Sequence, residues 1–217
     1  MNDVLERLRA ESAGAAETGS AETGSAEAGS AEAGSAEYVA LAAAGPDELA
    51  ASLSEAGRPL WARELAAYRL GLAGDRRAFE ALVLLLNHRD PPRCEAAAQA
   101  LAVLGDPRTA RAAAALATNE LRTAYALHPV RLLAALRAPE SAPALIRTLS
   151  RLLAPNDPYW RVALACVEGL GALADRRARE VLVRAQSHPR LAVAATAALR
   201  GLEPGQDSVL QSQSPLP

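Results

Sequence analysis

Among the residues that could bind a metal, the first candidates are the three histidines, His88, His128 and His188. Each precedes a proline directly or nearly so, and each occupies the same place in a repeated helical pattern described below. Helices in proteins pack about 8–10 Å apart, whereas zinc ligands must converge at about 2.0 Å from one ion. Histidines from successive repeats are therefore too far apart to share zinc, and we predict that they are loop residues and that there is no metal site.

Nucleophilic chemistry is equally unsupported. The two cysteines, Cys94 and Cys166, lie far apart and form no CxxC motif, so neither a zinc site nor a disulfide framework is indicated. No motif that would activate a nucleophile flanks them, nor does one flank Ser150 or Ser187. The glycine-containing runs LGLAGD and GLGALAD follow the helical repeat and not a phosphate-binding loop. We predict a protein that is not an enzyme and has no cofactor.

Arginine is the remaining side chain that could bind a ligand, and arginines are distributed unevenly along the chain. All 23 basic residues are arginine. Residues 1–56 contain two arginines and eleven acidic residues, whereas residues 57–203 contain 21 arginines and 13 acidic residues. An acidic leader is thus joined to a body of net charge +8. Such asymmetry is typical of a protein with a charged partner.

The elements that must position these arginines are predicted from an internal repeat. In five stretches a helix end is followed by a short break and a new helix start, with the break at Gly45, Asp75, Asp106, Ala138 and Asp175. Glycine favours the left-handed position that ends a helix, which we predict for Gly45, Gly74 and Gly105. Aspartate can cap the next helix. Alanine and leucine, strong helix formers, supply most of the apolar residues. We therefore predict an all-α fold of about five helical hairpins, each with helices A and B.

This pattern resembles the bacterial HEAT repeats that are also found in phycobilin lyases. The matching segments are AAQALAVLGDP (97–107) and DPPRCEAAA (90–98), and the resemblance covers residues 38–203. It implies an α-α superhelix, a solenoid in which stacked B helices line a concave face. The third repeat departs from the pattern, because Arg137 and Ala138 replace Gly and Asp. The shared residues serve packing and capping, so they imply the fold and no particular chemistry.

Two faces of the B helices follow from helical spacing. The core stripe comprises Phe79, Leu82, Val83, Ala142, Leu145, Ile146, Leu182 and Val183. A second face carries seven arginines, which we predict to bind a partner: Arg77, Arg108, Arg111, Arg147, Arg151, Arg177 and Arg184. Alternatively, this face is only solvated, with pairs such as Glu80 with Arg111 between repeats. Trp61 and Trp160, at the starts of A helices, either pack between repeats or anchor a partner.

The best-supported function is a non-catalytic interaction or scaffold module that binds an acidic protein or peptide on the arginine face. One alternative is a lyase-type or chaperone-like subunit acting on a modified protein, as the resemblance implies. Another is phosphate or nucleic-acid binding. Nucleic acid is disfavoured because single-strand binders interleave aromatic with basic residues, and the arginine face has no aromatic residue.

The two ends of the chain lie outside the repeats. Residues 1–37 contain a five-residue repeat of Glu, Gly, Ser, Thr and Ala, which predicts a flexible acidic leader with a short helix possible only at 3–10. This leader would be long enough to compete with a partner for the arginine face. Residues 204–217 are predicted to form a disordered tail. Neither a secretory signal nor a membrane-spanning run is evident, so we expect a cytoplasmic protein.

Overall fold

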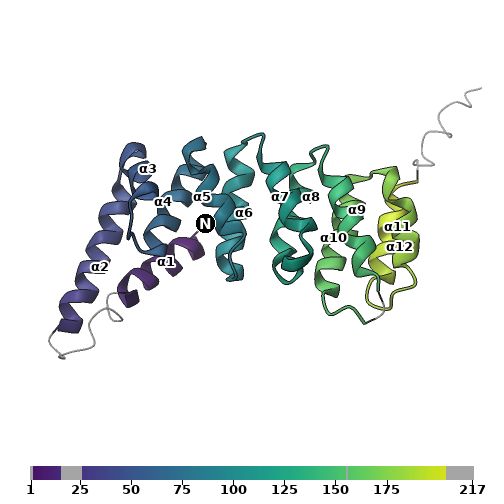
Figure 1. Cartoon of the computed structure of the whole chain (residues 1–217), viewed down its shortest axis with the longest axis horizontal. Helices are drawn as coiled ribbons and strands as arrows, with labels where there is room; N and C mark the ends of the chain where they lie inside the picture. Colours follow the sequence, from purple (N-terminus) through teal and green to yellow (C-terminus); the bar gives the residue numbers. More distant parts are fainter. Residues whose placement is uncertain (1, 16–25, 155, 204–217) are drawn as a thin grey trace, which may run out of the picture. The chain divides into compact units, whose positions relative to one another are not determined.

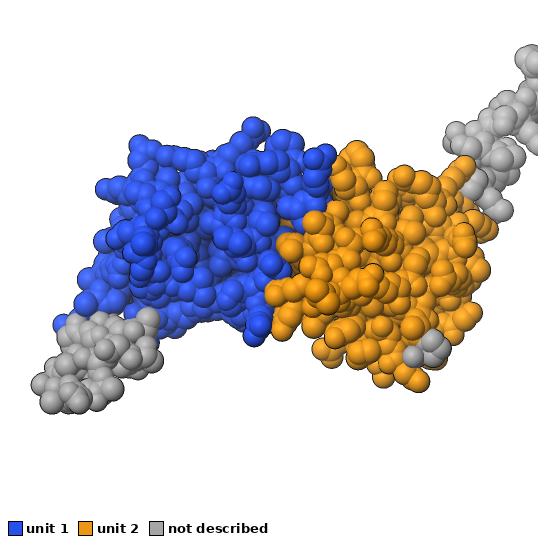
Figure 2. All heavy atoms as spheres, in the orientation of Figure 1, with its two compact units in different colours: residues 1–113 blue, residues 114–217 orange. Residues whose placement is uncertain are grey.

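The computed structural model describes residues 2–15, 26–154 and 156–203, and every element within these ranges is a helix (Figure 1). The chain divides into two compact units, Met1–Ala113 and Ala114–Pro217 (Figure 2). The all-α prediction is therefore confirmed. The predicted tail, 204–217, lies outside the described residues.

Unit 1 is built around helix α4 (Leu60–Leu72). Its other elements are α1 (Asn2–Ala15), α2 (Ala26–Ala43), α3 (Pro46–Ser54), the 3-10 turn η1 (Arg76–Ala78), α5 (Phe79–Leu86) and α6 (Pro91–Leu104). Helix α4 packs against α1, α2, α3, α5 and α6. Leu65 and Leu70 of α4 are fully buried or nearly so, together with Leu82 of α5 and Leu101 of α6. Helix α7 (Thr109–Thr118) contains the boundary between the units.

Unit 2 has α10 (Trp160–Leu173) at its centre. It also contains η2 (Glu120–Tyr125), α8 (Leu127–Leu136), α9 (Ser141–Leu152), η3 (Arg176–Ala178), α11 (Arg179–Ala185) and α12 (Ala192–Gly201). Helix α10 packs against α8, α9 and α12. A β-carbon on Gly171 of α10 would lie 2.9 Å from Cβ of Ala198 and 3.1 Å from its Cα. The absence of a side chain at Gly171 therefore lets α10 and α12 approach closely.

The helix breaks largely agree with the sequence prediction. Asp75 and Asp175 cap η1 and η3, and Gly74 and Gly105 have the left-handed φ values of 75° and 63°. The prediction for Gly45 is wrong: it has φ −76° and forms the N-cap of α3, where its amide donates to Glu48. A cap before a helix needs extended backbone, which does not require glycine.

Two residues other than glycine end helices in the left-handed conformation. Arg137 ends α8 with φ 50°, and Ala174 ends α10 with φ 52°. Arg137 stands where other repeats have glycine, yet it adopts the same left-handed backbone conformation. Glycine adopts this conformation without strain, and at Arg137 the surrounding fold imposes it.

The prediction of a flexible leader is wrong for the parts that the structure describes. Helix α1 covers residues 2–15, not only 3–10, and α2 begins at residue 26. The reason is tertiary packing, which outweighs the weak helix propensity of Gly and Ser. Leu8 is fully buried, and the Tyr38 hydroxyl donates to the Leu5 carbonyl oxygen at 3.0 Å. Residues 16–25 of the leader lie outside the described residues.

The predicted core stripe is correct for most positions, including Phe79, Leu82, Leu145 and Leu182. Val83 and Ile146 are only half-buried. Val183 is 49% exposed, so its assignment to the core is wrong. The short α11 buries Val181, Leu182 and Ala185 instead, and this directs Val183 toward solvent.

Candidate functional site

The seven predicted binding arginines are divided between the two units. Arg77, Arg108 and Arg111 belong to unit 1, and the other four belong to unit 2: Arg147, Arg151, Arg177 and Arg184. The predicted binding arginines therefore form two separate groups, one in each unit.

Three of these arginines are bound by an aspartate two residues earlier in the chain. In each case the aspartate accepts a hydrogen bond from the arginine backbone N–H and a second from its guanidinium group. The guanidinium Nη2 lies 2.6 Å from Asp75 in Arg77, 2.9 Å from Asp106 in Arg108 and 2.6 Å from Asp175 in Arg177. The hydrogen bonds from the arginine side chains lower the pKa of all three aspartates. This motif caps helices and uses the charge of the arginine internally.

Arg151 also has an internal role. Its side chain is half-buried, and Nη1 donates to the Thr123 hydroxyl at 2.7 Å. Its Nη2 is buried and finds no hydrogen-bond partner among the residues that the structure describes. Arg151 therefore connects α9 to η2 through a hydrogen bond. Because part of its guanidinium group is buried, it is poorly placed to bind a partner at the surface.

Arg111, Arg147 and Arg184 have the exposed, uncompensated guanidinium groups that the sequence predicts. All three are exposed, and none forms an ion pair with a described residue. In unit 2 this holds for a larger set of exposed arginines, which we call the unit 2 arginines: Arg131, Arg137, Arg147, Arg161, Arg176, Arg179, Arg184, Arg190 and Arg200. Residues 114–203 contain twelve arginines and seven acidic residues. The surface of unit 2 is therefore strongly basic.

One surface depression of unit 2 contains several of these polar groups. This unit 2 hollow has a volume of about 580 Å³ and lies between the α9–α10 loop and the α11–α12 loop. It is lined by Leu153, Asn156, Asp157, Pro158, Arg184, Ser187, His188, Pro189 and Arg190. Two of the unit 2 arginines, Arg184 and Arg190, thus border a single hollow.

Local hydrogen bonds hold the polar groups of the hollow in place. His188 Nδ1 accepts from the Arg190 backbone N–H at 3.3 Å, and Asp157 Oδ1 accepts from the Tyr159 N–H at 2.8 Å. Because Nδ1 of His188 is an acceptor, its neutral imidazole carries the proton on Nε2. The second nitrogen of this side chain is therefore a hydrogen-bond donor.

Trp160 fixes one of the arginines of the hollow. The guanidinium carbon of Arg190 lies 5.0 Å from the centre of the Trp160 ring, and that of Arg161 lies 5.5 Å from it. Trp160 is half-buried. Trp61, in contrast, is 4% exposed beside Tyr38 in the core of unit 1, so its alternative role as an exposed anchor is wrong. Trp160 remains next to the candidate site through Arg190.

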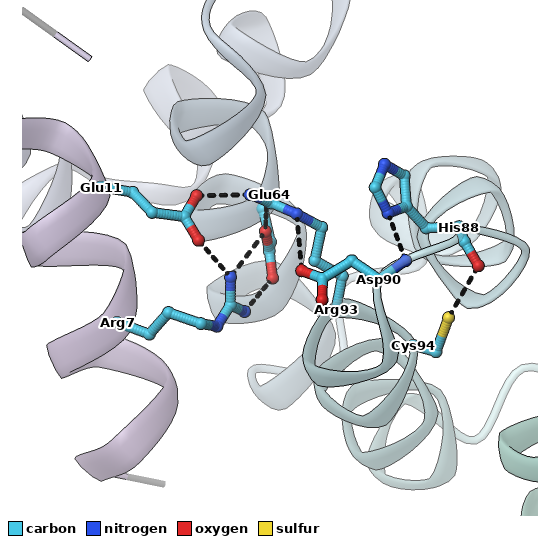
Figure 3. Close-up of polar contacts among 7 residues, drawn as sticks. All are labelled: Arg7, Glu11, Glu64, His88, Asp90, Arg93 and Cys94. Carbon is cyan, nitrogen blue, oxygen red and sulfur yellow. Dashed lines mark hydrogen bonds and ion pairs between the residues drawn. The ribbon is translucent and has the colours of Figure 1, made fainter. Parts of the chain in front are cut away.

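Unit 1 contains a second cluster of charged side chains, which the sequence pattern does not predict (Figure 3). Glu64 of α4 is only 1% exposed, and its carboxylate accepts from Arg7 of α1 and Arg93 of α6. Glu11 bridges the same two arginines, at 2.8 Å from Arg7 and 2.5 Å from Arg93, and Asp90 lies 3.2 Å from Arg93. Three carboxylates thus surround the two arginines. The cluster holds α1 against α4 and α6, and both of its arginines are already paired.

Only one feature of the sequence pointed to this cluster. Glu64 stands among apolar residues in LWARELAAYRL, where a buried carboxylate requires a cationic partner. Of its two partners, Arg7 lies 57 positions away in the sequence and Arg93 lies 29 positions away. Such separations cannot be derived from local spacing, and only the packing of three helices reveals them.

The other candidates for chemistry have structural roles. His88 Nδ1 accepts from the Asp90 N–H at 3.0 Å, and the Cys94 thiol donates to the His88 carbonyl oxygen at 3.1 Å (Figure 3). Burial raises the pKa of Cys166 to about 12, so its thiol stays protonated at neutral pH. Within the described ranges, no three His, Cys, Asp or Glu side chains form a group that could hold a metal.

Comparisons with known proteins add no assignment. No protein-family model and no curated protein matches this sequence. As for membranes, each described helix is too short or too polar to cross one. The candidate site is therefore defined by the geometry and charge of unit 2 alone.

Proposed function

We propose that this protein is a non-catalytic interaction module, a HEAT-like helical repeat whose basic unit 2 binds an acidic segment of a partner protein. The repeated helix breaks and their aspartate caps support the HEAT-like assignment. The unit 2 arginines, and within them the hollow beside Arg184 and Arg190, support the binding role.

The observation that carries this proposal is the absence of internal compensation on unit 2. The unit 2 arginines form no ion pairs with described residues, and among the exposed arginines of unit 2 only Arg177 does, with Asp175. In unit 1, by contrast, an acidic side chain pairs with each of five arginines: Arg7, Arg58, Arg77, Arg93 and Arg108. Uncompensated charge of one sign attracts an oppositely charged partner and raises its association rate. An acidic protein segment is the partner that this surface complements.

The composition of the whole chain favours a protein over a nucleic acid. Nucleic-acid-binding domains are typically strongly basic, with a pI above about 9. This chain has a net charge of −2 and a pI of about 6.0. A partner with a few acidic side chains gains from the local charge of unit 2.

The test is a charge reversal with a matched control. A fluorescein-labelled glutamate-rich peptide is titrated with the full-length protein and followed by fluorescence anisotropy. Reversal of Arg147 and Arg184 to glutamate is expected to weaken binding by about tenfold or more, since close charge pairs at interfaces contribute about 1.5 kcal/mol or more. Added salt is expected to weaken the wild-type complex because it screens exposed charges.

The control is Arg89→Glu, a charge reversal at an exposed arginine of unit 1 that forms no ion pair with a described residue. It changes the net charge of the chain without touching unit 2. If Arg89→Glu weakens binding as much per charge as the reversals in unit 2, binding is non-specific and the proposal fails. The proposal also fails if the wild-type protein does not bind the peptide at low salt.

A further inference from the structure

We propose that the unit 2 hollow is an oxyanion site that receives a phosphorylated side chain of the partner segment. This inference rests on the proposed function, since it names the group that the acidic partner would present. It is drawn from four properties of the hollow: a fixed guanidinium group, an oriented imidazole, an excess of positive charge, and a size that admits a peptide.

The first property is the cation–π contact between Arg190 and Trp160. Their separation of 5.0 Å is a cation–π contact, which limits the motion of the guanidinium group. The guanidinium is itself a planar fork of N–H donors, and no described residue forms an ion pair with that of Arg190. Such a planar fork matches two oxygens of a phosphate. Because the group is already held, less side-chain entropy is lost when an anion binds.

The second property is the turn that contains His188. The Arg190 backbone N–H donates to His188 Nδ1, which leaves Nε2–H as the free donor of the neutral ring. The same turn occurs in unit 1, where the Asp90 N–H donates to His88 Nδ1. There, however, the residue two positions after the histidine is an aspartate that pairs with Arg93. The same turn thus carries an aspartate, Asp90, in unit 1 and an arginine, Arg190, in unit 2.

The third property is the charge of the lining. Arg184 and Arg190 contribute two positive charges, and Asp157 contributes one negative charge, while Asn156 and Ser187 add neutral polar groups. Asp157 already accepts the Tyr159 N–H at the start of α10. A phosphoryl group has a charge of about −1.5 to −2 and three acceptor oxygens. It can accept from both arginines and His188 together, whereas a carboxylate has only two oxygens.

The fourth property is size. A volume of about 580 Å³ exceeds that of a phosphoryl group and leaves room for the residue that carries it. Leu153, Pro158 and Pro189 supply apolar surface within the same lining. These side chains can contact the backbone and neighbours of a phosphorylated residue. An isolated inorganic phosphate would leave that apolar surface unused.

The test compares three labelled peptides of one acidic sequence that differ at a single central position, which is serine, glutamate or phosphoserine. Binding to the full-length protein is measured by anisotropy. The phosphoserine peptide is expected to bind about tenfold more tightly than the glutamate peptide, as charge-assisted hydrogen bonds to additional oxygens predict. Acrylamide quenching of Trp160 is expected to change on binding. The buried Trp61 contributes little to that signal.

Three variants test whether the preference for phosphoserine arises in the unit 2 hollow. Arg190→Lys keeps the charge and removes the planar fork, so it is expected to lose most of the preference for phosphoserine over glutamate. Arg184→Ala is expected to weaken all three peptides. The control, Arg131→Ala, removes an exposed arginine of α8 that does not line the hollow. It is expected to preserve the preference. Circular dichroism verifies that each variant is folded.

The outcomes separate this inference from the proposed function. Equal binding of the glutamate and phosphoserine peptides overturns the phosphoryl site and leaves the acidic-segment function in place. A preference for phosphoserine that Arg190→Lys does not reduce also overturns it, because the hollow is then not responsible. Tighter binding of a single-stranded oligonucleotide than of any peptide overturns both. Failure of all three peptides to bind refutes the proposed function itself.

Discussion

Replacement of Leu8 by alanine tests whether the acidic leader is a tether or part of the fold. Leu8 is a fully buried residue of α1, and its side chain contributes to the core of unit 1. The same helix is held by Arg7 through Glu64, and the Leu5 carbonyl oxygen accepts from Tyr38. A leader that served only as a tether would tolerate the substitution without loss of stability.

The expected cost follows from burial. Truncation of a fully buried leucine to alanine destabilises proteins by about 2–5 kcal/mol. Helix α1 packs mainly against α2 and α4, and can adjust more easily than α4, so we expect the lower part, about 2–3 kcal/mol. With a urea dependence of about 1–3 kcal/mol per molar, the unfolding midpoint of unit 1 should fall by about 1 M.

Tryptophan fluorescence provides the assay. The chain has two tryptophans, so a Trp160→Phe background leaves Trp61, in the core of unit 1, as the sole reporter. Leu84→Ala is the matched control, because Leu84 also belongs to unit 1 but is 72% exposed. It is expected to change stability by no more than about 0.5 kcal/mol. If Leu8→Ala and Leu84→Ala have the same urea midpoint of unfolding, α1 does not stabilise unit 1 and the reasoning is refuted.

Three further predictions concern thiol chemistry, helix packing and pH. Because burial raises the pKa of Cys166 to about 12, iodoacetamide at neutral pH should alkylate it slowly in the native protein and rapidly in urea, as followed by mass spectrometry. Gly171→Ala should lower stability by about 1–3 kcal/mol in thermal unfolding, since the new β-carbon would overlap Ala198 of α12; unchanged stability would show that the two helices separate freely. The side-chain hydrogen bond from Arg108 lowers the pKa of Asp106 from 3.8, so this group stabilises the fold above its unfolded pKa. That contribution is lost as pH falls through the lower, folded pKa, and Asp106→Asn should therefore lose less stability than the wild type on acidification below about pH 4.

The leader shows where local sequence rules stop. Its Gly, Ser and Thr residues disfavour a helix, and no apolar residue larger than Ala occurs in 15–37, so a flexible segment is the reasonable prediction. The structure nevertheless places residues 26–37 in α2, whose later part buries Tyr38 and Leu41. Helix formation is cooperative, and a packed C-terminal half stabilises the turns before it.

The arginines show a related limit. Helical spacing placed Arg77, Arg108 and Arg177 on the same face as Arg147 and Arg184. Spacing does not reveal that the first three are occupied by the aspartates that cap their own helices. The Asp-x-Arg pattern itself contained this information, because a capping carboxylate lies within reach of a side chain two residues later.

The sequence by itself determined the helical class, the positions of the helix breaks and the excess of arginine in the body, because these depend on residues close together in the chain. Propensity, capping and hydrophobic period act over one or two turns. Only the tertiary structure decided that α1 belongs to unit 1, that Glu64 is neutralised by Arg7 and Arg93, and that Arg190 lies against Trp160. These contacts join residues that are distant in sequence, and they form because burial of apolar surface brings the helices together.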